Sequence, residues 1–519
     1  MLSTIDYVVL ICYAVTLLVL AQWVSREKAG HEKNSRDYFL AGNALPWWAI
    51  GASLIAANIS AEQIIGMSGS GYVIGLAIAS YEWMAAITLI IVGKYFLPIF
   101  LRNNITTMPQ FLEQRFDHKV RVILAVFWLG VYVFVNLTAV LWLGALAIEM
   151  VTGLDVVWGL VALGGFAAAY SLYGGLKAVA LTDILQVVLL VLGGLLIAGI
   201  ALNSISGGEG MIRGFGILLE RFPEKFDMIL SPDSPHYKDL PGISVLIGGM
   251  WVMNLSYWGF NQYVIQRALA AKSVAEAQKG IAFAAYLKLL MPIIVVLPGM
   301  AAVILVPDLA KPDQAYPAVM SLLPAGIMGL VFAALVAAIV SSLGSMTNSI
   351  STIFTLDLYA PTHKAASERH LVWVGRGVSL TALIIAMITA RPLLGQFDQA
   401  FQYIQEFTGF FTPGIVVIFL LGMFWRRTTA TGALAAALGS AILSLALKLQ
   451  WPSLPFIDRV GLVFLSCLGL ALAVSHLWPE AKPKSTIRLD DVRYATGTKF
   501  NIAALGVILI LTALYATWW

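Results

Sequence analysis

Apolar stretches of about 20 residues recur along the whole chain, and each is long enough to cross a bilayer as an α-helix. Shorter polar segments separate these stretches. We count about fourteen such spans. Their approximate centres are Tyr13, Ile59, Ala86, Val133, Leu163, Leu190, Met253, Leu290, Ala338, Ile384, Phe411, Leu434, Phe464 and Ile508. The pattern predicts an all-α polytopic membrane protein.

Lys and Arg residues gather in every second connection between the predicted spans. The connections after odd-numbered spans hold Arg26, Lys28, Lys33, Arg36, Arg102, Arg115, Lys119, Arg121, Lys177, Arg267, Lys272, Lys279, Lys364, Arg369, Arg426, Arg427, Lys482, Lys484, Arg488 and Arg493. The stretches near Gly75 and Gly153 hold none. Because basic residues favour the inner side, we expect odd spans to run inward and both termini to lie outside the cell (inner) membrane.

The composition supports a membrane protein and excludes several other classes. The chain of 519 residues is 60% hydrophobic and 12% charged, whereas soluble domains carry about 25% charged residues. The net charge of +4 is small, and no basic run suggests a nucleic-acid partner. Cys12 and Cys467 lie far apart in apolar spans, which argues against a disulfide. The start "MLSTIDY" has no basic segment before the apolar run, so we expect a retained first span rather than a signal peptide.

Motifs of enzymes and ATP-driven pumps do not occur in the sequence. All six histidines lie in loops or at span ends, which argues against a buried zinc or haem centre. No GxSxG, HExxH or P-loop pattern is found. We therefore expect neither an enzyme nor an ATP-driven transporter. The sequence carries no signal for the oligomeric state.

Ten polar residues interrupt the apolar spans. The ionisable ones are Glu62, Glu82, Asp183, Lys288 and Glu406, and the amides are Asn58, Gln63, Asn136, Asn254 and Gln405. A charged group at mid-membrane costs about 2.5–3.5 kcal/mol on insertion scales and usually faces a cavity or a partner. A hydrogen bond between helices explains any one of them, and we favour it for Asn136. Together they predict a polar cavity inside the helix bundle.

The chemistry of these side chains suits a neutral ligand with many hydroxyl groups. Amides donate and accept hydrogen bonds, a carboxylate accepts them, and an ammonium donates them. Aromatic residues, which can cover the apolar face of a sugar ring, lie beside the polar ones at Tyr81, Tyr257, Trp258 and Phe401, although ordinary packing explains each aromatic alone. An anionic substrate would favour an arginine at mid-span, and Arg267 lies near the inner end of its span.

Two spans carry small polar residues that weaken a helix. "AANISAEQIIG" and "VAAIVSSLGSMTNS" (336–349) are both predicted to be broken. Unwound carbonyls in broken spans often hold Na⁺, and the hydroxyls of Ser341 and Ser342 add oxygen ligands of the kind that hard cations prefer. Glu62 has no predicted role, because a helix turns it about 100° away from Gln63.

Six stretches carry a resemblance to a known family. They are "SRDYFLAGNALPWWAIGASLIAANISAEQIIGMSGSGY", "AIASYEWM", "YSLYGGLKAVALTD", "NLSYWGFNQYVIQR", "AAIVSSLGSMTNS" and "FQYIQEFTG". The chain resembles the sodium/solute symporter family, and within it the bacterial sodium/galactose (sodium/glucose) cotransporters. The resemblance implies a LeuT-like core of two inverted five-helix repeats, with one helix before it and three after it.

The resemblance also implies roles for individual residues. The sugar site would be Gln63, Glu82, Asn254, Lys288 and Gln405, with Tyr257 stacked on the sugar as inner gate and Asn58 holding it. The outer gate would be Met67, Tyr81 and Phe401. Na⁺ would bind the carbonyls of Ala56, Ile59 and Ala338 and the hydroxyls of Ser341 and Ser342, with Asp183 on its exit route. Ala85 departs from the serine of the family pattern, and the loss of one hydroxyl contact of about 0.5–1.5 kcal/mol leaves the preferred sugar open.

The expected organisation is therefore an N-terminal helix and loop (1–45), a first repeat (46–204), an outer loop with a surface helix (205–240), a second, inverted repeat (241–428) and three C-terminal helices (429–519). The expected function is Na⁺-coupled import of a neutral monosaccharide, one Na⁺ per sugar, by alternating access across the bilayer. The alternative within the class is a symporter for another polyol such as myo-inositol. The alternative from another class is a sensor or a channel.

Overall fold

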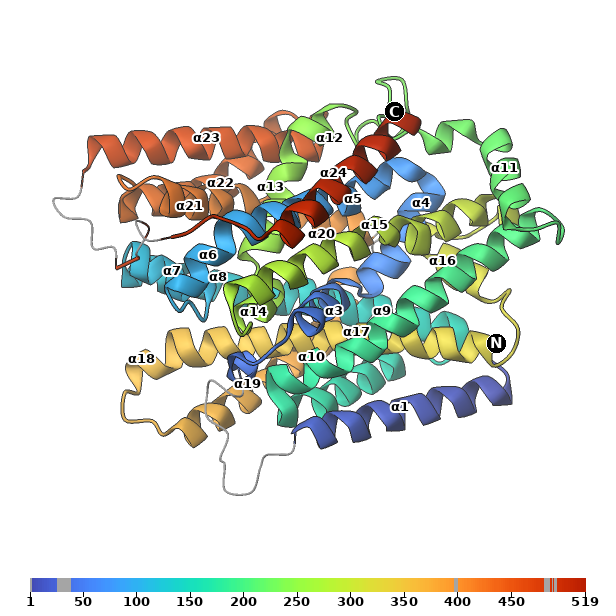
Figure 1. Cartoon of the computed structure of the whole chain (residues 1–519), viewed down its shortest axis with the longest axis horizontal. Helices are drawn as coiled ribbons and strands as arrows, with labels where there is room; N and C mark the ends of the chain where they lie inside the picture. Colours follow the sequence, from blue (N-terminus) through green and yellow to red (C-terminus); the bar gives the residue numbers. More distant parts are fainter. Residues whose placement is uncertain (1, 26–38, 396–399, 480–485, 488, 490–491) are drawn as a thin grey trace.

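The computed structural model describes residues 2–25, 39–395, 400–479, 486, 487, 489 and 492–519. Within these ranges the chain is helical, with an isolated β-bridge between Leu45 and Ala271. The basic residues Arg26, Lys28, Lys33, Arg36, Lys482, Lys484 and Arg488, which we used for the orientation, lie outside the described residues. Figure 1 shows most helices running side by side, roughly along the longest axis of the molecule.

Most predicted spans correspond to one helix or to a pair of helices, whereas the spans centred on Leu163 and Leu190 both fall on one long helix, Val156–Ile205. Among the described residues, nine helices are long and apolar enough to cross a membrane, or ten when one bent pair counts as a single span. Three shorter apolar helices, Thr4–Leu20, Val156–Ala169 and Thr412–Phe424, match further predicted spans. The remaining predicted span, centred on Met253, is divided between two short helices. The all-α polytopic fold is confirmed.

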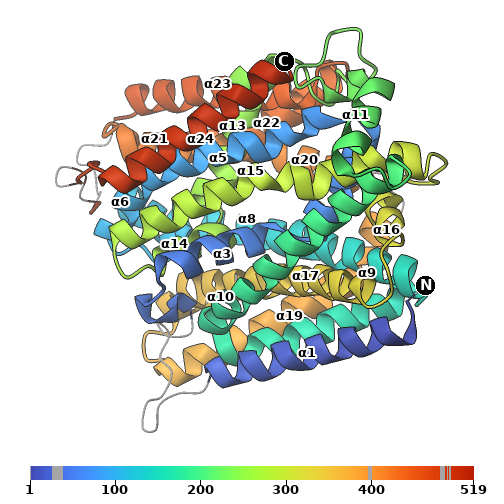
Figure 2. The same ribbon diagram turned by 45° about the vertical axis from the view of Figure 1, so that its right-hand side comes forward.

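The main elements have the following bounds: α1 (Thr4–Ser25), α3 (Trp47–Asn58), α4 (Met67–Val73), α5 (Ser80–Ile91), α6 (Leu97–Arg102), α8 (His118–Val131), α9 (Thr138–Thr152), α10 (Val156–Ile205), α13 (Gly249–Leu255), α14 (Gln262–Leu269), α15 (Val274–Leu305), α17 (Ile327–Thr352), α19 (Glu368–Leu394), α20 (Ala400–Gly409), α21 (Thr412–Phe424), α22 (Ala430–Gln450), α23 (Phe456–Leu477) and α24 (Thr498–Thr517). Figures 1 and 2 both place α1 along one edge of the bundle and α22, α23 and α24 along the opposite edge.

Each half of the core begins with a broken helix. In the first half, α3 ends at Asn58, Ile59 is extended (φ −71°, ψ 93°), and the chain continues at 61° to α3 through a π-turn at Glu62–Gly66 into α4. In the second half, α13 passes through a π-turn at Ser256–Phe260 to an extended Asn261 (φ −80°, ψ 120°) before α14. The first break was predicted. The second was not, although Gly259 and Asn261 are residues that interrupt helices.

The break that we predicted within 336–349 is wrong, because α17 is continuous from Ile327 to Thr352. Its hydroxyl groups bond back along the helix instead of opening it. Ser345 Oγ donates to Ser341 O at 2.7 Å, and Thr347 Oγ1 donates to Leu343 O at 2.8 Å. A bond of this kind shares a carbonyl that the helical ladder already uses, so the ladder stays intact.

Both termini lie at the same end of the bundle, as the right-hand half of Figure 1 shows. The Asp6 carboxylate accepts hydrogen bonds from the N–H groups of Gly326 and Gly329 at the start of α17, both at 2.7 Å. The Met228 N–H donates to Trp518 O at 2.7 Å near the other terminus. The segment 205–240 contains the expected surface helix, α11 (Met211–Arg221), and the turn η6 (Pro223–Phe226).

Candidate functional site

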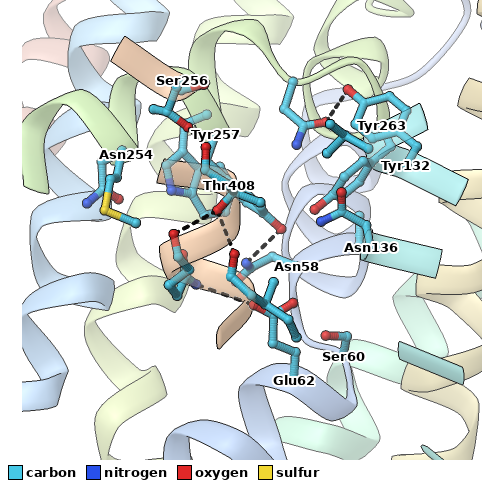
Figure 3. A pocket seen from close by; sticks show the side chains of 18 of the residues that line it. Asn58, Ser60, Glu62, Tyr132, Asn136, Asn254, Ser256, Tyr257, Tyr263 and Thr408 are labelled. Atoms are coloured by element: carbon cyan, nitrogen blue, oxygen red, sulfur yellow. Dashed lines mark hydrogen bonds between the residues drawn. The ribbon is translucent and has the colours of Figure 1, made fainter. Parts of the chain in front are cut away.

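A cavity of about 120 Å³ lies where the two helix breaks meet. Side chains from α5, α8, α15, α17, α20, α21 and the π-turn Tyr132–Leu137 complete its walls. The residues predicted to bind substrate all line it: Gln63, Glu82, Asn254, Tyr257, Lys288 and Gln405. The structure thus brings together residues from five separate parts of the chain. Figure 3 shows Asn254 and Tyr257 of this set near Asn58 of the first break.

Lys288 is the positive charge of this cavity. Its ammonium group contacts the Glu82 carboxylate and donates to Asn58 Oδ1, and its Nζ lies 4.9 Å from the centre of the Trp258 ring. Lys288 and Glu82 are both buried. A buried charge is tolerated when it is paired and hydrogen-bonded. Because the two charges offset each other, this pair presents hydrogen-bonding groups to a ligand without a net charge of its own.

Glu62 and Gln405 form a second polar pair in the wall. Gln405 Nε2 donates to Glu62 Oε1 at 3.3 Å, and Glu62 and Gln63 both line the cavity. We expected Glu62 to turn away from Gln63, but both lie within the π-turn, whose wider winding changes the spacing of an α-helix. Among the described side chains, Gln63 Oε1 is buried without a hydrogen-bond partner, so it is available to a ligand.

Aromatic side chains surround the second break. Asn58 Nδ2 donates to the Tyr257 hydroxyl at 3.0 Å, so these two residues are in contact. Tyr132, which the sequence analysis did not identify, donates to Asn261 Oδ1 at 2.8 Å and accepts from the Gln262 N–H at 2.9 Å. The Tyr132 hydroxyl therefore satisfies polar groups that the break releases. Asn136, which we interpreted as a contact between helices, lines the cavity.

An apolar layer adjoins the cavity at the residues predicted as the outer gate. The rings of Tyr81 and Phe401 meet edge to face with centroids 5.5 Å apart. Phe401 packs directly on Gly66, where an added Cβ would lie 2.8 Å from Phe401 Cβ. Met67, the next residue, is fully buried. In this structure the layer is closed.

Ser342 joins α17 to the end of α3. Its hydroxyl lies 3.3 Å from Ala57 O and 3.5 Å from Ala56 O, next to the extended residue Ile59. Ala338 precedes Ser342 by about one helical turn. The predicted sodium ligands Ala56, Ile59, Ala338 and Ser342 therefore come from two elements that are in contact at the break.

Ser341 and Asp183 belong to a neighbouring buried network. The Ser341 hydroxyl donates to the Asp183 carboxylate, which also accepts from Ser53 Oγ at 2.5 Å. The Arg267 guanidinium lies 3.8 Å from the same carboxylate, and its Nε donates to Ser53 Oγ at 2.7 Å. Arg267, which we placed near the inner end of its span, is fully buried beside Asp183. A buried carboxylate needs a cation or several hydrogen-bond donors. An aspartate within an apolar span, such as Asp183, could therefore have indicated a cationic partner like Arg267.

Glu406, the remaining ionisable residue of the predicted spans, does not line this cavity. Its carboxylate contacts Arg459 and Lys448 of the C-terminal helices at 2.8 and 3.0 Å.

Discontinuous helices that meet at a polar cavity inside a membrane bundle are typical of secondary transporters, the LeuT type among them. The chain belongs to the sodium:solute symporter family, whose sequence profile matches residues 38–439. Its coupling ion is therefore Na⁺. This confirms the family and the inverted-repeat fold that the resemblance implied.

Three relatives illustrate the similarity. The chain is 51% identical to the sodium/glucose cotransporter of Vibrio parahaemolyticus over 100% of this chain and 99% of that protein. It is 36% identical to the human sodium/myo-inositol cotransporter 2 over 85% of this chain and 69% of that protein. Among solved structures, a Na⁺-coupled sialic acid symporter in its outward-open state superposes with a TM-score of 0.81 at 25% identity, over 93% of this chain and 99% of that one.

Proposed function

We propose that this protein is a Na⁺-coupled symporter that imports a neutral monosaccharide of the galactose or glucose type by alternating access. The observation that carries this proposal is the Lys288–Glu82 pair within a cavity that also holds Gln63, Asn254 and Gln405. Sugar hydroxyls both donate and accept, so they match the carboxylate, ammonium and amide groups of the wall. The similarity to a sodium/glucose cotransporter along the whole chain supports the same substrate class.

In this proposal the side chains divide into a binding set and two gates. Gln63, Glu82, Asn254, Lys288 and Gln405 bind the hydroxyls of the sugar. Tyr257 covers the ring from the inner side and is held by Asn58. Met67, Tyr81 and Phe401 close the outer side. Ala85, where the family pattern has a serine, offers no hydroxyl. Uptake of labelled galactose and glucose therefore decides which epimer the protein prefers.

Na⁺ binds between α3 and α17 in this proposal. The carbonyls of Ala56, Ile59 and Ala338 and the hydroxyls of Ser341 and Ser342 supply oxygen ligands of the type that hard cations take. Bound Na⁺ would tie the broken helix to α17 and so stabilise the form that receives sugar from outside. Asp183 would receive the ion on its way to the inside. One Na⁺ accompanies each sugar.

The proposed arrangement in the membrane follows the basic residues. Both termini lie at one end of the bundle, and because basic residues favour the inner side of a membrane, we place this end outside the cell (inner) membrane. The repeats then correspond to 46–204 and 241–428. Residues 1–45, 205–240 and 429–519 form the N-terminal, outer-loop and C-terminal parts.

A substrate and ion panel tests the proposal. Purified protein in proteoliposomes is offered labelled galactose, glucose, myo-inositol and sialic acid under imposed Na⁺, Li⁺, K⁺ or H⁺ gradients. We expect saturable uptake of a neutral hexose that only the Na⁺ gradient drives strongly. Preference for myo-inositol would assign the polyol alternative. Flux that does not saturate, or that no ion gradient drives, would indicate a channel and contradict the proposal.

A further inference from the structure

Glu406 is a charged residue of the predicted spans for which the substrate and sodium sites give no role. It lies on α20, a helix of ten residues. Its Oε1 accepts from Arg459 Nη2 of α23 at 2.8 Å, and it lies 3.0 Å from Lys448 Nζ of α22. The Arg459 side chain is 6% exposed. Charged groups within spans are costly, so a paired one that does not line the cavity indicates a specific task.

Another face of α20 carries substrate-site and gate residues. Phe401 packs on Gly66 and meets the Tyr81 ring, and Gln405 donates to Glu62. The same short helix therefore joins the closed apolar layer to an ion cluster. A displacement of α20 would move Phe401 and Gln405 together.

The turn between α20 and α21 is supported by α22. Ser440 Oγ donates to Phe410 O at 2.8 Å and accepts from the Gly414 N–H at 3.1 Å. Ser444 Oγ donates to the same carbonyl at 3.3 Å. Backbone groups released by a break must find partners inside a membrane, and two serines of α22 provide them here.

The first turns of α23 also contact both α20 and α13. A Cβ added at Gly409 of α20 would lie 3.1 Å from Val460 Cγ2, and one added at Gly249 of α13 would lie 2.0 Å from Ile457 O. Only a glycine at position 249 therefore allows α13 and α23 to approach this closely. Since α13 carries Asn254 and α20 carries Gln405, the start of α23 contacts two elements of the cavity wall.

From these contacts we infer that the C-terminal helices α22 and α23 support the transport site, and that Glu406 is a positioning residue that holds α20 in its closed position through Arg459 and Lys448. The role of Phe401 as a gate rests on the proposed function, but the contacts of Glu406 with Arg459 and Lys448 do not depend on which substrate is carried. Removal of the Glu406 charge weakens the attachment and shifts the population towards forms in which α20 is displaced.

Amide hydrogen exchange tests the inference without any substrate, so its failure can be told apart from failure of the proposed function. The purified chain in nanodiscs is compared with the Glu406→Gln variant. We expect about tenfold faster exchange of the amides of α20, because local opening sets that rate, with unchanged exchange in α22 and α23. Unchanged exchange in α20 would overturn the inference. An equal increase of exchange in α20, α22 and α23 would also overturn it, because it would mean that the variant destabilises the whole protein.

Two further variants complete the test. Glu209→Gln is the matched control, because Glu209 pairs with Arg213 at 3.8 Å on the surface and its side chain is 73% exposed; we expect no change in α20. Glu406→Asp keeps the charge and should restore slow exchange to within about twofold of the unaltered chain. Exchange as fast as in Glu406→Gln would show that the charge does not hold α20 and would also overturn the inference.

Discussion

Lys288 shows how a single residue sets the character of the cavity. Its ammonium group is fully buried among the Glu82 carboxylate, the Asn58 amide and the Trp258 ring. Each of these partners belongs to a different element, so the charge of Lys288 links α15 to α5, to the end of α3 and to the second break. A neutral residue at this position would leave Glu82 as an uncompensated charge.

We expect Lys288→Ala to abolish uptake and to destabilise the protein. Removal of one partner of a buried ion pair costs about 3–5 kcal/mol, because the other charge stays buried. The check is thermal unfolding of the purified variant together with uptake in proteoliposomes. As a control, Lys288→Met combined with Glu82→Gln should recover much of the stability but no transport. Normal uptake by Lys288→Ala would show that the cavity is misplaced.

Ser342→Ala should weaken Na⁺ dependence while the sugar contacts remain. Loss of one hydroxyl ligand, worth about 1 kcal/mol, raises the half-saturating Na⁺ concentration by about five- to tenfold. The measurement is uptake at a fixed sugar concentration over a series of Na⁺ concentrations. Ser351→Ala is the matched control, since Ser351 is a buried serine of the same helix. If the two variants show equal Na⁺ dependence, the proposed sodium site is wrong.

The polar residues of the spans were the part of the site that the sequence could indicate. Charges are so costly in lipid that Glu62, Glu82 and Lys288 identified the cavity without any structure. Partners were harder to predict, because they come from distant parts of the chain. Arg267 and Tyr132 lie in the spans as unremarkable basic and aromatic residues. Only the tertiary structure, which brings Arg267 to Asp183 and Tyr132 to Asn261, reveals what they bind.

At the scale of elements, the breaks in the helices could be predicted only in part. The break after Asn58 follows from small and polar residues within an apolar run. The break at Asn261 depends equally on Tyr132, which bonds the released Gln262 N–H from another helix. In α17 similar serines and threonines bond backwards and leave the helix intact. Local sequence therefore shows where a helix is weak, whereas tertiary partners decide whether it opens.

The helix before the core has a testable structural role. The Asp6 carboxylate of α1 accepts from Gly326 and Gly329 at the start of α17, so it caps the helix that carries Ser342. Asp6→Ala should cost about 0.5–2 kcal/mol, the usual value of a cap, and lower the unfolding temperature in nanodiscs. Asp155→Ala, which removes the exposed cap of α10, is the comparison. A smaller loss for Asp6→Ala than for Asp155→Ala would contradict this role, because the Asp6 carboxylate is buried.

At the scale of the whole molecule, energy coupling limits the sugar gradient that the protein can build. One charge that moves through about 100 mV contributes roughly 2.3 kcal/mol, and a tenfold Na⁺ gradient contributes about 1.4 kcal/mol. With one Na⁺ per sugar, the two together allow accumulation of several hundredfold, since each 1.4 kcal/mol is about a factor of ten. Reversal potentials measured at several sugar gradients should give one charge per sugar. A value of two charges would contradict the one-to-one coupling.

The central claim is that one cavity binds the sugar and that Na⁺ at the neighbouring break favours this binding. The most direct measurement is calorimetric titration of the sugar selected by the substrate panel into the purified protein, in Na⁺ and in K⁺, for the unaltered chain and for Asn254→Ala. We expect binding in Na⁺, at least about tenfold weaker binding in K⁺, and a similar loss of affinity in the Asn254→Ala variant. Equal affinity in the two salts, or unaltered affinity in the variant, would contradict the account.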